Sequence, residues 1–210
     1  MHFLGNLFLG AFVSFGVLCG YAEPTNDDLR VEDRKQAEKF VQDLGDKGIS
    51  TLTGSGLSKE ERQKRFEDLF VVAFDYERIG KFVLGRFRRD VKPADMKTYL
   101  GLFKGMVVRV YAARFGEYDD EKFEVYDSRI IDKKVDTAIV SSKIIRRNNS
   151  KVQIEWHIYK SKSGTYKIFD VVVEGVSMAL TQRSEFAAIL QRDGISGLIN
   201  QLQSQKNSKK

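Results

Sequence analysis

The sequence contains few of the residues that build cross-links, metal centres and nucleophilic active sites. Among 210 residues there is one cysteine, Cys19, and there are two histidines, His2 and His157. Cys19 falls in an apolar leader that we expect to be removed, so the mature chain has no thiol and only His157 as a histidine. This excludes a disulfide, a cysteine nucleophile and a thiolate or multi-histidine metal site, and we expect neither metal nor cofactor.

Proline is also scarce, with only Pro24 and Pro93, so no stretch has the composition of a disordered linker. The formal net charge is +6, and Lys and Arg are interspersed with Asp and Glu along the chain. A protein that binds nucleic acid usually gathers its basic residues on one face or stripe. We therefore expect no nucleic-acid partner.

The leader, residues 1–22, reads MHFLGNLFLGAFVSFGVLCGYA and contains no Lys, Arg, Asp or Glu. It ends with Gly20 and Ala22, small residues at the spacing that signal peptidase recognises, which predicts a secretory signal cleaved after Ala22. An uncleaved membrane anchor is the alternative, because the apolar run is nearly long enough to span a bilayer. We predict one domain over residues 23–205 and a disordered basic tail at 206–210.

The first half of the chain has the apolar period of amphipathic helices. Ser58 and Glu61 have the spacing of a capping box, Asp75 can cap a short helix, and Pro93 suits a first helical position. We expect helices over residues 29–52, from residue 58 to about 73, shortly after residue 75, and from 93 to near 116.

The second half changes to the two-residue period of strands, most clearly from Val152 to Lys160. Short turns between successive runs indicate an antiparallel meander. We expect strands at 122–131, 137–146, 152–160 and 166–173, and closing helices at 184–192 and 196–204. The fold class is α+β, with an antiparallel four-stranded sheet packed against a helical subdomain.

Two carboxylates and one basic run are candidates for function. Asp170 lies in an apolar strand and Glu174 opens the following turn, where a buried carboxylate could act as a general base. The alternative is that Asp170 faces solvent or pairs with a lysine and that Glu174 caps backbone. No histidine or second acid completes a catalytic set, and Ser177 lacks the glycine of a nucleophile elbow, so we expect no catalytic residue.

The basic run is residues 85–92, GRFRRDVK. It is a solvated connection or a surface for anionic headgroups or an acidic protein partner. Its candidate contact residues are Arg86, Arg88, Arg89 and Lys92.

Several short segments together resemble a known family. They are FDVVVEGVSM at 169–178, QRSEF at 182–186 and GISGL at 194–198, with FVLGR at 82–86, PAD at 93–95 and the single tryptophan, Trp156. Over residues 28–205 the chain resembles the MlaC-like periplasmic phospholipid-binding proteins, also described as toluene-tolerance auxiliary proteins. The resemblance implies an NTF2-like sheet, a helical subdomain and a cavity between them that holds acyl chains.

The same resemblance implies a periplasmic carrier that shuttles phospholipid between the outer and inner membranes. Its implied partners are an inner-membrane ABC transporter with a lipid-binding ring subunit and an outer-membrane lipoprotein–porin complex. A carrier of another lipid, such as a hopanoid, and an NTF2-like enzyme that uses Asp170 stay open as alternatives.

We expect the cavity wall to be apolar, although the same side chains could fill an ordinary core. In the turn, Gly175 lets the chain leave the sheet, Glu174 and Ser177 satisfy backbone groups, and Val176 with Met178 closes one end of the pocket. The predicted lipid-binding residues are Phe74, Ile79, Phe82, Val83, Phe103, Val107, Tyr111, Trp156, Ile158, Val172, Gly175, Val176 and Met178.

Overall fold

The computed structural model describes residues 26–53, 56–115, 121–132 and 136–207. The predicted signal peptide and its cleavage site lie outside these residues. The elements in chain order are α1 (Asn26–Leu52), α2 (Lys59–Ala73), α3 (Tyr76–Val83), the 3₁₀ helix η1 (Gly85–Asp90), α4 (Pro93–Arg114), β1 (Lys122–Asp132), β2 (Thr137–Ile145), β3 (Lys151–Lys160), β4 (Tyr166–Val173), β5 (Val176–Ser177) and α5 (Met178–Asn207).

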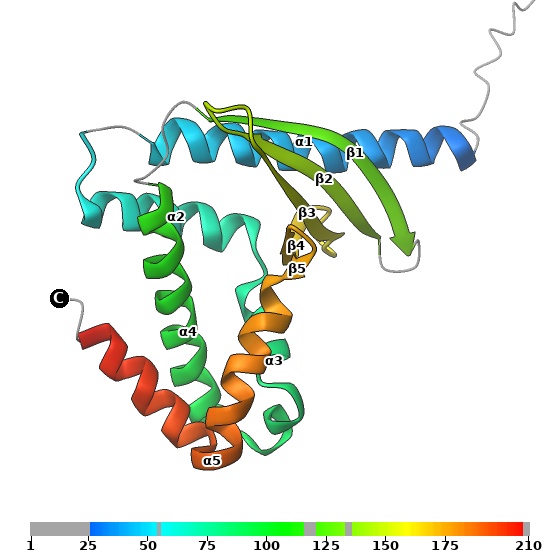
Figure 1. Cartoon of the computed structure of the whole chain (residues 1–210). Coiled ribbons are helices and arrows are strands. Elements are labelled where there is room, and N and C mark those ends of the chain that lie inside the picture. Colours follow the sequence, from blue (N-terminus) through cyan, green and yellow to red (C-terminus); the bar gives the residue numbers. More distant parts are fainter. Residues whose placement is uncertain (1–25, 54–55, 116–120, 133–135, 208–210) are drawn as a thin grey trace, which may run out of the picture.

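The strands form one antiparallel sheet in the order β1-β2-β3-β4-β5. The predicted α+β class and meander are confirmed, but the strand count is five, because the two residues of β5 pair back onto β4. Irregularities between Val125 and Asp127 in β1, and after His157 in β3, interrupt the regular pairing. Such bulges bend strands, and the sheet is visibly curved in Figure 1.

Helix α1 runs along the concave side of this sheet (Figure 1). Its Ala37 and Val41 are fully buried and pack against alternate residues of the strands, as a period of two requires. The strand members of this buried cluster are Ala138, Val140, Ile158 and Ile168.

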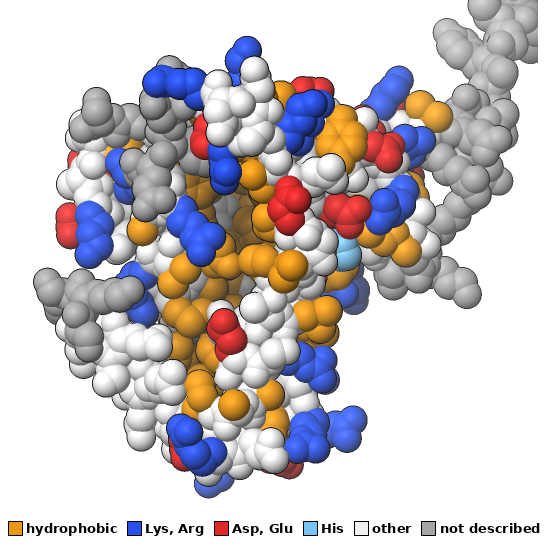
Figure 2. Space-filling view, viewed as in Figure 1, with side chains coloured by type: hydrophobic (Ala, Val, Ile, Leu, Met, Phe, Trp, Pro, Cys, Tyr) orange, Lys and Arg blue, Asp and Glu red, His pale blue; other side chains and the backbone are white. Residues whose placement is uncertain are grey.

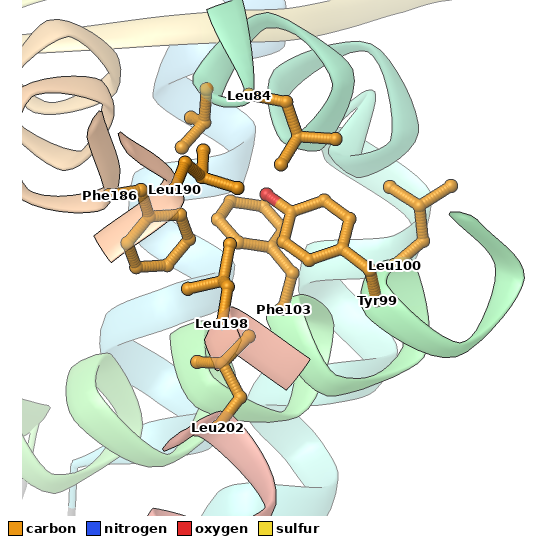
Figure 3. Packing of buried hydrophobic residues seen from close by; sticks show 9 residues of the cluster. Leu84, Tyr99, Leu100, Phe103, Phe186, Leu190, Leu198 and Leu202 are labelled. Atoms are coloured by element: carbon orange, nitrogen blue, oxygen red, sulfur yellow. The ribbon is translucent and has the colours of Figure 1, made fainter. Parts of the chain in front are cut away.

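A second unit consists of α3, α4 and α5, below the sheet in Figure 1. Helix α5 turns back on itself at Gly194, whose φ of 63° is the left-handed conformation that glycine adopts easily. The two legs of α5 enclose one side of α4 and bury a dense cluster, shown in Figure 3. Its buried members are Val83, Leu84, Tyr99, Leu100, Phe103, Phe186, Leu190, Leu198 and Leu202.

The helix starts follow local chemistry, with one exception. The capping box of Ser58 and Glu61 is present, Asp75 accepts a hydrogen bond from the backbone of Arg78, and Pro93 opens α4. The exception is α5, which begins at Met178 instead of residue 184. It also continues through residue 207, so the first two residues of the predicted tail are helical.

The helices that the structure describes include none with both the length and the apolar character that crossing a membrane requires.

Candidate functional site

A cavity of about 480 Å³ lies between the sheet and the helical unit. It appears in Figure 2 as a hollow walled by hydrophobic side chains. This volume falls within the range of small-molecule sites, about 300–1,000 Å³. The wall is made by Leu44, Gly45, Gly48, Ile49 and Leu52 of α1; Phe66, Leu69 and Phe70 of α2; Phe74; Ile79 and Val83 of α3; Phe103, Val107, Tyr111 and Arg114 of α4; Phe115; strand residues Phe123, Ile144, Val152, Ile154, Trp156, Asp170, Val171 and Val173; and Met178, Ala179 and Gln182 of α5.

The wall is apolar almost throughout, and most of its polar groups are already bonded within the protein. The indole nitrogen of Trp156 donates to the hydroxyl oxygen of Ser142 over 2.8 Å. Burial raises the pKa of Tyr111, so its phenol stays neutral at physiological pH. A wall of this kind favours hydrocarbon over water.

Asp170 is the one carboxylate among the described wall residues, and both of its oxygen atoms accept hydrogen bonds from the protein. Its Oδ1 accepts from the backbone nitrogens of Val171 (2.8 Å) and Ala179 (3.0 Å), and its Oδ2 accepts from the Ser177 hydroxyl (2.5 Å). The bond from Ala179 satisfies a free backbone donor in the first turn of α5. Asp170 therefore anchors the start of α5 to β4, which is a structural role.

The turn between β4 and β5 has the geometry of a two-residue hairpin. Glu174 and Gly175 have φ of 49° and 78°, and Val173 pairs with Val176 across them. The Glu174 carboxylate accepts from the backbone nitrogen of Gln153, and the Ser177 hydroxyl accepts from the backbone nitrogen of Leu180. Both side chains thus satisfy backbone groups, as the sequence predicted.

Comparison with known proteins identifies the family of this chain. The sequence model of the family described as "MlaC protein" matches residues 42–204. The chain belongs to the MlaC family.

Two proteins illustrate how the MlaC relatives compare with this chain. The toluene tolerance protein ttg2D of Pseudomonas putida is 24% identical over 121 residues, which is 57% of this chain and 55% of that protein, so the match spans about half of its length. A phospholipid-binding protein from Ralstonia solanacearum, solved in complex with a phospholipid, superposes with a TM-score of 0.73 at 21% identity. That superposition covers 82% of this chain and 97% of the other, and it shows that the two share a fold.

The structure brings eight of the predicted residues together in the wall of the cavity. They come from both halves of the molecule and converge although they are far apart in the sequence. These residues are Phe74, Ile79, Val83, Phe103, Val107, Tyr111, Trp156 and Met178. That they contact lipid stays a prediction.

The other five predicted residues lie elsewhere. Phe82 does not line the cavity: it is 39% exposed, and the guanidinium of Arg183 lies 5.2 Å from its ring centre. Ile158 is fully buried in the cluster beneath α1, where it is core and not wall.

The remaining three belong to the end of the sheet. Because side chains alternate along β4, Val171 and Val173 face the cavity and Val172 lies on the other face of the sheet. Val176 is 52% exposed, so the prediction that it closes the pocket is wrong. Gly175 is exposed in the hairpin and contributes only the turn.

The basic residues of the run at 85–92 are also remote from the wall. Arg86, Arg88 and Arg89 belong to η1 and Lys92 precedes α4; all four are exposed and none lines the cavity. The use of this run as a headgroup contact at this cavity is therefore not supported, and a partner surface and a solvated connection both stay predictions.

Sequence reasoning missed the walls contributed by α1 and α2. A signal was present in α1, because its apolar stripe continues through Leu44, Ile49 and Leu52 beyond the part that covers the sheet. For β3 the alternation already placed Val152 and Ile154 on the face of Trp156. Nothing in the sequence indicated Arg114 as a wall residue, because Lys and Arg are mixed with Asp and Glu along the whole chain.

Proposed function

We propose that this protein is a phospholipid carrier that holds acyl chains in the cavity between the sheet and the helical unit. The observation that carries the proposal is the apolar chamber of about 480 Å³ in a chain of the MlaC family. The Ralstonia solanacearum protein with the same fold is named as phospholipid-binding and was solved with a phospholipid.

The physics of transfer supports such a role. Moving one methylene from water into an apolar environment contributes about 0.8 kcal/mol, so a lipid tail does not leave a membrane without an apolar destination. Side chains such as Phe74, Val107 and Trp156 offer that destination within one folded unit. A wall that is apolar almost throughout holds the tails by non-directional contacts, which suits uptake and release.

The wider role follows from the family. We propose that the protein carries lipid across the periplasm between the outer and inner membranes as the soluble component of an ABC-type transport system. Residues 1–22, with the pattern of a secretory signal, support export. The transporter and the outer-membrane complex named above are the proposed partners, and the exposed run of Arg86, Arg88, Arg89 and Lys92 is the proposed surface for one of them.

Catalysis by Asp170 is not proposed. A general base needs a free lone pair directed at the substrate. Hydrogen bonds from Val171, Ala179 and Ser177 already occupy the carboxylate and connect it to the helix start.

The proposed binding is tested by following lipid directly. The mature chain, expressed in a bacterial host and analysed by native mass spectrometry, should carry the added mass of a phospholipid. After removal of that lipid, the protein should take up labelled phospholipid from vesicles. A chain that is isolated empty and takes up none would refute the proposal.

A further inference from the structure

One charged residue stands at the opening of the cavity. Of the wall residues that the structure describes, Arg114 alone is exposed to solvent, and the others are buried or half-buried. It belongs to the last turn of α4, next to Phe115 and one turn beyond Tyr111. Figure 2 shows charged side chains of both signs at the edge of the hollow, in contrast to its hydrophobic walls. Arg114 therefore marks the border between the apolar chamber and water.

Within the described residues, the guanidinium of Arg114 contacts an aromatic ring and forms no ion pair. Its central carbon lies 5.5 Å from the ring centre of Tyr111, a cation–π contact that orients it along the wall. No carboxylate within the described residues lies within ion-pair distance of it. Lys104, on the same helix, differs: it forms an ion pair with Glu67 over 2.5 Å.

The other charged wall residue does not offset this cation. Asp170 is engaged by three donors of the protein and is half-buried. Arg114 is therefore the cationic group among the described wall residues, and guanidinium groups bind phosphate and carboxylate oxygens through paired hydrogen bonds.

We propose that Arg114 binds the anionic group of the lipid whose tails fill the cavity, and so selects amphiphiles with a negative charge next to their acyl chains. This inference rests on the proposed function, since it concerns the same cavity. The ligand class is lipids with a phosphate or carboxylate at the head of the chains. Uncharged lipids, such as diacylglycerol or a hopanoid, lack the group that Arg114 binds.

A structural role for Arg114 makes a different prediction. A cation in the last turn of a helix stabilises the helix dipole, and acidic residues follow Arg114 in the sequence at 117, 119 and 120. A structural role of either kind, at the helix end or as the partner of an acidic residue, would change stability on substitution and leave the choice of lipid unaltered. Lipid choice is therefore the readout that separates the two.

The test compares Arg114→Gln with Arg109→Gln, a control on the same helix that does not line the cavity. Delipidated proteins are equilibrated with vesicles that contain phosphatidylglycerol or diacylglycerol with the same acyl chains. Wild type should prefer phosphatidylglycerol. Arg114→Gln should retain about tenfold less of it, the effect of one lost charge-assisted hydrogen bond, with diacylglycerol unchanged. Arg109→Gln should behave as wild type.

Palmitate as a third probe identifies the source of the charge. An equal loss for palmitate and phosphatidylglycerol means that Arg114 binds any anionic head, and a loss for phosphatidylglycerol alone means that it binds phosphate. Equal retention of both vesicle lipids by wild type, or equal losses of both in Arg114→Gln, would overturn the proposal while the carrier function stands. If wild type takes up neither, the carrier function itself fails.

Discussion

Two apolar regions of the molecule are lined by similar side chains, but one is filled and the other is hollow. In the helical unit, the rings of Phe103 and Phe186 meet edge to face with centres 6.4 Å apart, and Leu198 and Leu202 close the space between the legs of α5. Above it, rings such as those of Phe70 and Phe74, 4.8 Å apart, line a cavity of about 480 Å³. We call these regions the helical core and the chamber.

Geometry, not composition, accounts for the difference. In the helical core, α4 and both legs of α5 are close enough for side chains from each to interdigitate (Figure 3). The walls of the chamber are a curved sheet, the end of α1, and helices that belong to the other unit (Figure 1). The side chains that line these walls leave a space of about 480 Å³ between them.

The largest difference is expected from equal truncations in the two regions. Leu198→Ala removes a fully buried side chain of the helical core and should lower the free energy of unfolding by about 3 kcal/mol. Leu69→Ala widens a space that already exists and should cost about 1 kcal/mol. Urea unfolding of the delipidated proteins measures both. Equal costs would mean that the chamber is packed as tightly as the core.

Filling the chamber should abolish binding without loss of stability. Gly48 lies in α1, and a Cβ there would meet only the ring of Phe115, at 3.9 Å, so the side chain in Gly48→Leu has room to extend into the cavity. Bound phospholipid should fall about tenfold or more, because overpacking against a ligand costs about 1–3 kcal/mol.

The matched control is Gly101→Leu, on an exposed part of α4 with open space around it. Both substitutions remove a helical glycine and should stabilise by roughly 0.5–1 kcal/mol. Only the change at Gly48 should affect lipid content in mass spectrometry. A loss of lipid in both variants would show that the effect does not arise in the chamber.

Substitution of Asp170 should change the stability of the protein and not its lipid binding. Asp170→Asn removes the charge and one acceptor oxygen, so the bonds from Ala179 and Ser177 weaken. We expect a loss of about 1–2 kcal/mol in unfolding free energy, with unchanged phospholipid uptake by the folded protein. Ser177→Ala removes the bond to Asp170 and also the acceptor of the Leu180 backbone nitrogen, so it should cost a similar amount. Abolished uptake in folded Asp170→Asn would contradict this role.

The smallest effect distinguishes two tyrosines. Tyr99 is buried in the helical core, and its hydroxyl donates to the carbonyl oxygen of Gly80 over 3.0 Å, so Tyr99→Phe should cost about 1 kcal/mol. Tyr111 lies at the opening of the chamber, and none of the described residues accepts a hydrogen bond from its hydroxyl. Tyr111→Phe should therefore leave the stability at neutral pH nearly unchanged.

The pH dependence of stability gives a second measurement on Tyr99. Burial raises the pKa of Tyr99 far above its ordinary value, so the folded protein keeps the phenol protonated when the unfolded chain ionises. Its contribution is complete below the unfolded pKa of about 10 and is lost as pH rises above that value. Tyr99→Phe should therefore show a shallower alkaline loss than wild type. Parallel curves would contradict the assignment.

Much of the fold could be predicted because its signals are local. The capping box of Ser58 and Glu61, the position of Pro93 and the alternation through Trp156 each depend on residues close in sequence. The start of α5 was missed although Ser177, directly before Met178, caps it by accepting from the backbone nitrogen of Leu180; only the second acceptor, Asp170, comes from a neighbouring strand.

The chamber was less predictable than the fold. The apolar residues of α3 share one face, so Phe82 was assigned to the wall together with Val83, although it is 39% exposed and does not line the cavity. Whether apolar residues fill a space or surround it depends on the distance between units, which no sequence pattern encodes. The position of Arg114 at the opening likewise depends on the distance between the units.

The single tryptophan allows the most direct measurement of the central claim. Trp156 lies in the chamber wall, and the chain has no other indole. Phospholipid with brominated acyl chains should quench its fluorescence on binding, whereas the unbrominated lipid should not, and Gly48→Leu should abolish the effect. Binding of brominated lipid with undiminished Trp156 emission would show that the tails lie outside the chamber and would contradict the account.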